Sequence, residues 1–287
     1  MTDKDTFFKP KLTLNVAGQI IDLAQPKVMG ILNLTPDSFY KGSRTQSESE
    51  VLATAEKMLA DGADFLDLGA YSTRPGADDI SENEEEERLL PAIKNLKRAF
   101  PKAVLSVDTF RASIAEKAID NGAHIINDIS GGMLDKKMFE TVGKLNVPYV
   151  LMHLKGNPKT MNLLNQYGNM SQEIVQHLSD KVHQLKAFGV KDIVIDPGFG
   201  FAKNADQNFE LLNQLDRLKI LGLPILAGLS RKSMIWRTLG ITANDALNGT
   251  TALNMIALQK GANILRVHDV KEAKECITIF SKLKDSE

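Results

Sequence analysis

The chain has 287 residues, a formal net charge of -1, 43% hydrophobic and 25% charged residues. These values are ordinary for a globular protein, and without a basic excess we expect no nucleic-acid partner. The N-terminus has no apolar signal core, and no apolar run approaches a membrane span, so we expect a cytoplasmic protein without membrane contact. The single Cys276 excludes an intrachain disulfide, fits a reducing compartment and is expected to be packed in the interior.

A β-hairpin is expected first in the chain. Residues 12–16 and 20–23 are strand-like and flank the turn pair Ala17-Gly18. No linker or low-complexity block divides the sequence that follows. We therefore expect one domain over residues 1–287, with a hairpin at about 11–24 covering the lower end of a barrel at about 26–285.

The rest of the chain alternates short apolar segments with amphipathic ones. Apolar runs of four to eight residues are typical of strands buried on both faces. Eight strands are expected, at residues 28–32, 65–68, 104–107, 124–126, 149–152, 193–195, 225–229 and 264–267. Eight helices are expected, at residues 51–59, 84–100, 112–120, 136–145, 172–188, 207–218, 247–259 and 271–283. Glycines that suit helix ends follow five of them, at Gly62, Gly122, Gly189, Gly222 and Gly261.

Eight βα units in a chain of this length fit a closed (β/α)8 TIM barrel, an α/β fold that typically needs about 250 residues. An open doubly wound sheet is the lesser alternative. Such a sheet usually has fewer strands and a glycine-rich nucleotide turn after the first of them. Here the first strand runs into residues 33–37, which contain no such turn.

Polar residues stand where most of these strands end. They are Asn33, Asp108, Asn127, Asp128, His153, Asp196, Ser230 and His268. In parallel α/β folds the carboxyl ends of the strands form the rim where ligands bind, so we expect these side chains to surround one mouth. The connections at about 33–50, 69–83 and 155–171 are long, and such loops are often functional lids rather than tolerated insertions.

Each motif also has a purely structural interpretation. Residues 33–39 suit an Asx-type turn, Arg74 suits a solvated surface, and Asp108 suits a helix cap. Residues 84–87, four consecutive glutamates, are expected to be the solvated first turn of a helix. The glycines of residues 196–201 would let backbone and an aromatic ring approach a ligand closely.

Cations gather after the last two strands. Arg231 and Lys232 follow the seventh strand and Arg266 lies in the eighth, where this fold frequently binds phosphate. Such a mouth suits a ligand with a phosphate-like anion at one end and a donor-rich heterocycle at the other. The sequence has neither an HExxH motif nor a Cys/His cluster. We expect a metal only as Mg²⁺ held by Asn33 together with substrate phosphates.

Seven motifs, in order, resemble those of the dihydropteroate synthase family. They are residues 33–39, 72–77, 106–109, 127–129, 196–201, 230–232 and 266–270. The resemblance runs from about residue 26 to residue 270. It implies a transferase that condenses 6-hydroxymethyl-7,8-dihydropterin diphosphate with 4-aminobenzoate, giving 7,8-dihydropteroate and pyrophosphate. This is a step of folate biosynthesis in which sulfonamides compete with aminobenzoate.

The resemblance also implies residue roles and a homodimer formed through helices of the last units. The implied pterin contacts are Asp108, Asn127, Met152, Asp196, Phe201, Gly228, Lys232 and Arg266. The diphosphate would be held by Asn33, Arg266 and His268, with Mg²⁺ beside Asn33. The implied aminobenzoate contacts are Thr73, Arg74, Pro75, Phe201, Ser230 and Lys232. Catalysis is expected to depend on Asp37, Lys232, Arg266 and His268.

Two departures from the family pattern concern loop contacts. Tyr71 stands where many members have a Glu, and residues 40–43 read Tyr-Lys-Gly-Ser instead of the usual Ser-Asp-Gly-Gly. Two alternatives to a synthase remain. A methyltetrahydrofolate-type methyltransferase of the same pterin-binding superfamily would share Asp108, Asn127 and Asp196. A non-catalytic pterin-binding paralogue would keep the pocket without the chemistry.

Overall fold

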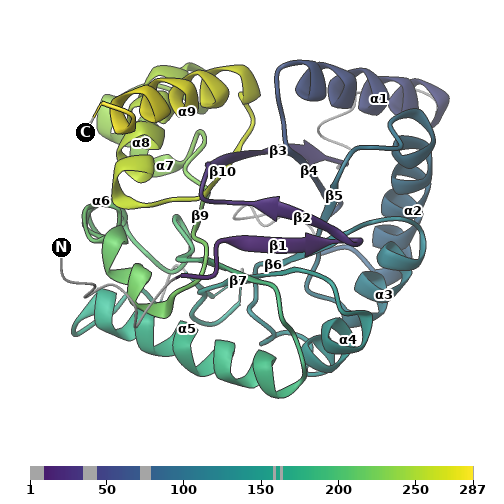
Figure 1. Cartoon of the computed structure of the whole chain (residues 1–287), viewed down its shortest axis with the longest axis horizontal. Coiled ribbons are helices and arrows are strands. Elements are labelled where there is room, and N and C mark those ends of the chain that lie inside the picture. Colours follow the sequence, from purple (N-terminus) through teal and green to yellow (C-terminus); the bar gives the residue numbers. More distant parts are fainter. Residues whose placement is uncertain (1–9, 35–43, 72–78, 158–159, 162–163, 287) are drawn as a thin grey trace.

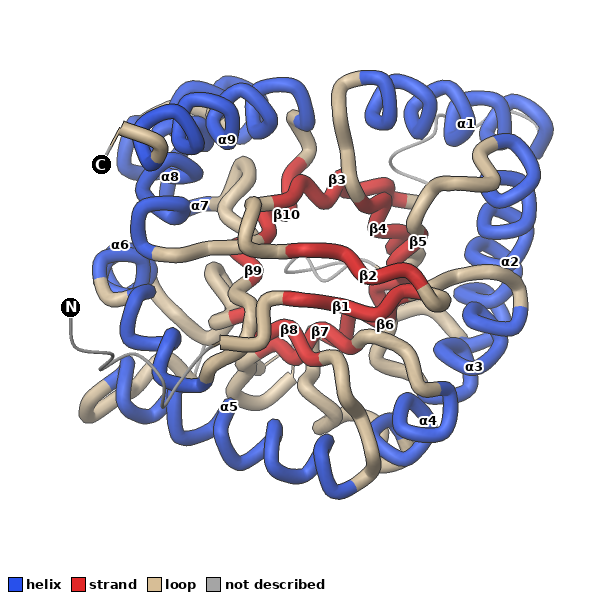
Figure 2. The backbone as a smooth tube through the Cα atoms, in the orientation of Figure 1, coloured by secondary structure: helices blue, strands red, loops and turns tan. Residues whose placement is uncertain are grey.

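A computed structural model describes residues 10–286, except 35–43, 72–78, 158–159 and 162–163. Parallel strands form a central barrel, and helices surround it on the outside (Figures 1 and 2). The barrel strands are β3 (Lys27–Asn33), β4 (Phe65–Gly69), β5 (Leu105–Asp108), β6 (Ile125–Asp128), β7 (Tyr149–Met152), β8 (Ile193–Asp196), β9 (Leu226–Ala227) and β10 (Ile264–Val267). A parallel bridge from Ile195 to Ile225 joins β8 to β9 and closes the ring. The expected (β/α)8 barrel is confirmed.

Helices follow the strands around the ring. They are α1 (Arg44–Ala60), α2 (Glu82–Ala99), α3 (Ala112–Asp120), α4 (Met138–Leu145), α5 (Met170–Ala187), α6 (Ala205–Asn213), α7 (Ser233–Leu239), α8 (Leu247–Lys260) and α9 (Val270–Lys284). The glycines Gly62, Gly122, Gly189, Gly222 and Gly261 all have positive φ, as expected for helix ends. The chain therefore turns back into the sheet at the points that the sequence indicates.

The N-terminal hairpin covers one end of the barrel (Figure 1). Strands β1 (Thr13–Val16) and β2 (Gln19–Asp22) pair antiparallel around Ala17 and Gly18, both of which have positive φ. Such a two-residue turn matches the twist of a hairpin. Leu14 and Val16 pack in one cluster with residues at the beginnings of the barrel strands, among them Met29 and Phe65. The expected hairpin lid is confirmed.

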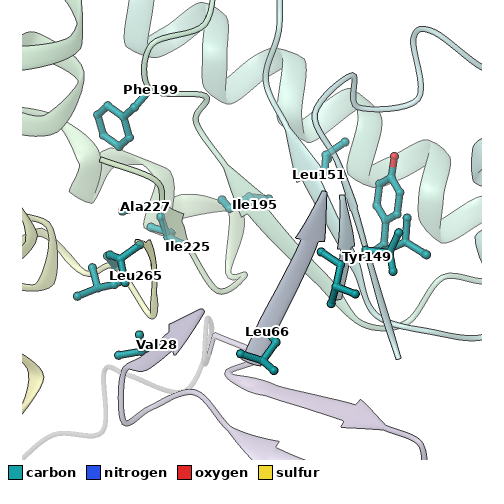
Figure 3. Packing of buried hydrophobic residues seen from close by; sticks show 14 of the residues in the cluster. Val28, Leu66, Tyr149, Leu151, Ile195, Phe199, Ile225, Ala227 and Leu265 are labelled. Atoms are coloured by element: carbon teal, nitrogen blue, oxygen red, sulfur yellow. The ribbon is translucent and has the colours of Figure 1, made fainter. Parts of the chain in front are cut away.

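Alternation along each strand decides which side chains face the barrel interior. In β4, Phe65 belongs to the interior cluster under the hairpin, whereas Leu66 and Leu68 pack towards the helices. Figure 3 shows part of this outer layer, including Leu66 and Tyr149. The same alternation places polar residues such as Asp67 inside, above the apolar layer and nearer the carboxyl ends of the strands.

Three expectations about local structure are wrong. The helix expected at 207–218 ends as α6 at Asn213, and a 3-10 helix (Leu215–Leu221) follows, in which Leu215 and Leu218 are buried. Helix α7 was not expected, since seven residues ending at Gly240 are too short to show a helical period. The strand expected at 225–229 is shorter: β9 covers Leu226–Ala227, and Ile225 adds only the bridge to Ile195.

The glutamate run at the start of α2 is also not wholly solvated. Ser81 and Glu84 form the capping box of the helix. Glu85 is completely buried, accepts a 2.6 Å hydrogen bond from the hydroxyl of Thr109, and forms an ion pair with Arg111. Burial raises the pKa of Glu85, and its two partners act against that rise. This glutamate therefore ties α2 to the end of β5.

Candidate active site

Arg266 joins four barrel strands through their inward-facing side chains. Its Nε lies 2.6 Å from Oδ2 of Asp67, and its Nη2 lies 2.7 Å from Oδ2 of Asp108. The amide Nδ2 of Asn127 donates to the same Oδ2 of Asp67 at 2.9 Å. The sequence expectation that Asp108, Asn127 and Arg266 meet is confirmed, and Asp67 is the residue that links them.

Burial and ion pairing set the charges of this network. Burial raises the pKa of Asp108 to about 7, although the neighbouring Arg266 lowers it. Burial acts to lower the pKa of Arg266, but Asp67 and Asp108 outweigh it, so the net pKa is raised and the guanidinium stays charged. Oδ1 of Asp67 and the hydroxyl of Ser106, at paired positions on β4 and β5, are buried without a hydrogen-bond partner.

Asp196 and Lys232 form the next part of the site. Asp196 ends β8, and its Oδ1 accepts a 2.7 Å hydrogen bond from the backbone N–H of Gly198. Lys232 donates to the carbonyl oxygen of Phe199, and its Nζ lies 4.9 Å from the centre of the Phe201 ring. Burial raises the pKa of Asp196 and lowers that of Lys232 to about 8, while each charge opposes the shift of the other.

Ser230 and His268 lie together beyond the ends of β9 and β10. The Ser230 hydroxyl is 3.0 Å from Nδ1 of His268 and accepts a 3.1 Å hydrogen bond from the backbone N–H of His268. Arg231 behaves differently from Lys232. Its guanidinium binds both carboxylate oxygens of Asp269, at 2.9 and 2.8 Å, and the carbonyl of Asn244. Of the two neighbouring cations, Arg231 fixes a loop and Lys232 faces the site.

The other expected site residues are placed as follows. Met152 is buried in a small apolar cluster against which Phe201 packs. Gly228 lies next to Lys232, since a Cβ added to it would be 3.9 Å from Nζ. Asn33, at the end of β3, is paired in register with Gly69, which in turn is paired with Asp108. Asp37, Thr73, Arg74 and Pro75 lie outside the described residues.

Two of the polar strand ends do not reach the mouth. Asp128 faces the helices, where it accepts hydrogen bonds from the backbone of Ser130 and Gly132 and from the hydroxyl of Tyr149. Adjacent residues of a strand point to opposite faces, so Asn127 and Asp128 cannot both face the interior. His153 is buried behind the turn that follows β8, beside Lys203.

Asp67 is the site residue that the sequence analysis missed. It lies two residues before the end of β4, inside the apolar run Phe65-Leu66-Asp67-Leu68, and not at the strand end where site residues are expected. The available signal was a single carboxylate within an otherwise apolar strand. A fully buried carboxylate needs a charged or hydrogen-bonded partner.

This geometry agrees with comparisons to known proteins. A family model described as pterin binding enzyme matches residues 29–268. The chain belongs to the pterin-binding enzyme family. The dihydropteroate synthase of Clostridium beijerinckii is 43% identical over 85% of this chain and 89% of its own length.

Solved structures of this family share the fold as well as the sequence. A Yersinia pestis dihydropteroate synthase in complex with a sulfonamide drug has a TM-score of 0.89 and 38% identity, covering 95% of this chain and 99% of that one. A Xanthomonas albilineans dihydropteroate synthase with 4-aminobenzoic acid has a TM-score of 0.88 and 36% identity, covering 95% of this chain and 98% of that one. The pterin-binding barrel therefore matches these enzymes over nearly the whole chain.

Proposed function

We propose that the chain condenses 6-hydroxymethyl-7,8-dihydropterin diphosphate with 4-aminobenzoate to form 7,8-dihydropteroate and pyrophosphate in folate biosynthesis. The observation that carries this proposal is the arrangement of Asp108, Asn127, Asp196 and Lys232 around Arg266 at the carboxyl ends of the barrel strands. The comparisons support it, because the relatives and structures described above are dihydropteroate synthases.

The pterin would occupy the deep end of this site. Its amino group and ring N–H form a fork of donors, which carboxylates such as Asp196 accept in parallel. Asp108 and Asn127 would line the same end, and Lys232 would donate to the pterin carbonyl and ring nitrogen. Met152, Phe201 and Arg266 would form the walls, and Gly228 would leave room for the ring.

The diphosphate would lie at the other end, against Asn33, Arg266 and His268. Among the described residues, no three His, Cys, Asp or Glu side chains are grouped to hold a metal ion. We propose that Mg²⁺ takes an oxygen of Asn33 and completes its shell with substrate phosphates and water, as this ion commonly does. When bound, Mg²⁺ would neutralise charge on the departing pyrophosphate.

The chemistry follows from the weak nucleophilicity of an arylamine. We propose a dissociative substitution, in which the bond from the pterin methylene to the diphosphate oxygen breaks ahead of carbon–nitrogen bond formation. Arg266 and His268 would stabilise the leaving pyrophosphate. Asp37 is the candidate to stabilise positive charge at the methylene. Phe201, Ser230 and Lys232, with Thr73, Arg74 and Pro75, would hold the aminobenzoate.

The two alternatives fit the site less well. A methyltetrahydrofolate-type methyltransferase releases no diphosphate and has less use for Lys232, Arg266 and His268 together. A non-catalytic paralogue has no use for the anion end at all. Both are disfavoured by the intact cations Lys232 and Arg266, of which Arg266 is held by Asp67 and Asp108, and by His268 beside Ser230.

We also propose a cytoplasmic homodimer formed through the last helices. Large apolar side chains are exposed there, at Leu239 on α7, Ile256 on α8, and Ile279 and Leu283 on α9. Cys276 is a buried free thiol, which suits a reducing compartment. The described residues form no helix long and apolar enough to cross a membrane. Sedimentation of the parent chain and of Ile279→Lys would test the dimer, which we expect the substitution to weaken.

One measurement tests the proposed reaction. Pyrophosphate release from the dihydropterin diphosphate would be followed with and without 4-aminobenzoate. We expect release that depends on aminobenzoate and a product that contains both rings. No release beside intact pterin binding would exclude the synthase and favour the non-catalytic alternative. Release without a product that contains both rings would exclude the synthase and indicate hydrolysis of the diphosphate.

A further inference from the structure

A buried lysine, Lys203, lies behind the turn that follows β8. Its side chain is 8% exposed, which is uncommon for lysine. Its Nζ lies 2.9 Å from the carbonyl oxygen of Gly198, 3.0 Å from that of Phe201 and 3.2 Å from Nδ1 of His153. Three contacts match the three N–H donors of an ammonium group. The lysine is therefore fully engaged by the protein itself.

These contacts can persist in both protonation states of Lys203. Burial lowers the pKa of Lys203 to about 7 and that of His153 to about 2, so the imidazole is neutral. A charged Lys203 donates to both carbonyls and to Nδ1 of His153. A neutral Lys203 still has two N–H groups for the carbonyls, and its lone pair can accept from the other tautomer of His153.

The turn that Lys203 holds has an unusual backbone. Gly198, Gly200 and Ala202 all have positive φ, at 72°, 79° and 50°. Such a conformation is unfavourable for a residue with a Cβ, as in Ala202. A Cβ at Gly198 would overlap the carbonyl oxygen of His153, so the turn is pressed against the end of β7. Contacts from outside the turn are needed to keep this shape.

The same turn carries groups of the proposed pterin site on its other side. The N–H of Gly198 orients Asp196, and the carbonyl of Phe199 holds Lys232, which lies over the ring of Phe201. Lys203 thus binds the turn from behind, and Lys232 binds it from the mouth. A shift of the turn would therefore move Asp196, Lys232 and Phe201 together.

We propose that Lys203 is a positioning residue for the pterin site, which fixes Asp196 and Phe201 by holding the carbonyls of Gly198 and Phe201. This inference rests on the proposed function, because it concerns the pterin end of the same site. Lys203 itself would touch neither substrate. Its removal should therefore weaken pterin binding while the anion end, on β3 and β10, keeps its affinity.

The test compares two ligands in four proteins by calorimetry. Lys203→Met keeps an unbranched side chain that is shorter by the terminal nitrogen, and so removes the N–H donors. We expect a rise of about tenfold in the Kd of the dihydropterin diphosphate, and a pyrophosphate Kd (with Mg²⁺) within about twofold of the parent. Lys203→Arg restores N–H donors and should recover most of the pterin affinity. The control is Lys27→Met. Lys27 is partly buried and pairs with Asp64 at the opposite end of the barrel from the proposed site, so this variant should bind both ligands as the parent does.

Each outcome decides between the proposals. Failure of the parent chain to bind the pterin would reject the proposed function. Parent-like pterin affinity in folded Lys203→Met, or equal loss of both ligands, would reject only the role of Lys203. If Lys203→Met does not fold, Tyr167→Phe removes a 3.1 Å hydrogen bond to the carbonyl of Ala202 in the same turn. Parent-like pterin affinity in Tyr167→Phe would then reject the role, and a selective loss would support it.

Discussion

The guanidinium of Arg266, on the last barrel strand, lies 2.6 Å from the carboxylate of Asp67, on the second. Asp67 is completely buried, and its Oδ2 accepts hydrogen bonds from both Arg266 and Asn127. The pair joins the two strands on either side of β3 and fixes the cation that faces the proposed diphosphate. Because this ion pair links the buried core to the proposed active site, its loss should affect both the stability of the protein and the binding of pyrophosphate.

Asp67→Asn should therefore be strongly destabilising. It removes the negative charge from a fully buried position and leaves Arg266 with Asp108 alone. Breaking a buried ion pair commonly costs about 3–5 kcal/mol, and we expect the lower end because one partner remains. Chemical denaturation would measure the loss. Glu140→Gln, at the exposed pair with Lys144, is the control and should leave the denaturation midpoint unchanged.

Asp196→Asn should weaken pterin binding selectively. The new amide places a donor opposite the donors of the pterin, and an unpaired buried donor costs about 1–3 kcal/mol, or roughly tenfold to a hundredfold in affinity. Asp192→Asn is the matched control, since Asp192 precedes the same strand at its other end and pairs with Lys11. Equal pterin affinity in Asp196→Asn and the parent, by calorimetry, would leave Asp196 as only the cap of the Gly198 turn.

The anion end should respond to His268 and Arg266. Pyrophosphate with Mg²⁺ should bind the free protein, and His268→Ala and Arg266→Ala should each weaken it, because the removed groups are proposed to hold the phosphates. His183→Ala changes an exposed histidine on α5 and should bind as the parent does. If pyrophosphate binds both site variants unchanged, the assignment of the diphosphate to β10 is wrong.

The raised pKa of Asp108 predicts how stability depends on pH. Burial raises this pKa to about 7, whereas an unfolded aspartate titrates near 4. Between these values the folded protein binds more protons, so its stability falls as pH rises through the window. Asp108→Asn cannot titrate and should gain stability relative to the parent between about pH 5 and about pH 8, by at most about 1.4 kcal/mol per pH unit within the window.

Chemical denaturation of the parent and of Asp108→Asn, at about pH 5 and about pH 8, measures how the difference in their stability changes with pH. The comparison isolates Asp108, because the other buried carboxylates and histidines are common to parent and variant. A difference that does not change with pH would show that Asp108 stays ionised throughout.

The sequence predicted the barrel and much of its mouth for a physical reason. Four site residues come where an apolar run ends in the sequence, and this change from apolar to polar identifies them. They are Asp108, Asn127, Asp196 and His268. A resemblance to one family then supplied their expected roles. The pattern of apolar runs could not separate Asn127 from Asp128, since only strand orientation decides which of the two faces the interior.

Asp67 and Lys203 could not be found in that way. Asp67 lies within a strand, and its importance depends on Arg266, which is 199 residues away along the chain. Lys203 lies in a loop and becomes buried only because the turn after β8 folds back against His153. Both act through contacts between distant segments, which neither periodicity nor a local motif contains.

The two substrates draw their expected contacts from different parts of the fold. Pterin contacts such as Asp196 come from the rigid ends of paired strands. Aminobenzoate contacts such as Thr73 and Arg74 belong to a long connection between β4 and α2. Ordering a loop around a ligand costs conformational entropy, which contacts with a first ligand can offset.

We therefore expect aminobenzoate to bind the free protein poorly, and to bind well only when the pterin and Mg²⁺-pyrophosphate sites are filled. Calorimetric titration of aminobenzoate, alone and with pterin and Mg²⁺-pyrophosphate present, measures the difference. Such coupling is reciprocal, so a sulfonamide that takes the aminobenzoate position should tighten pterin binding by the same factor. Equal aminobenzoate affinity under both conditions would contradict this order and indicate that the second site is already formed in the free protein.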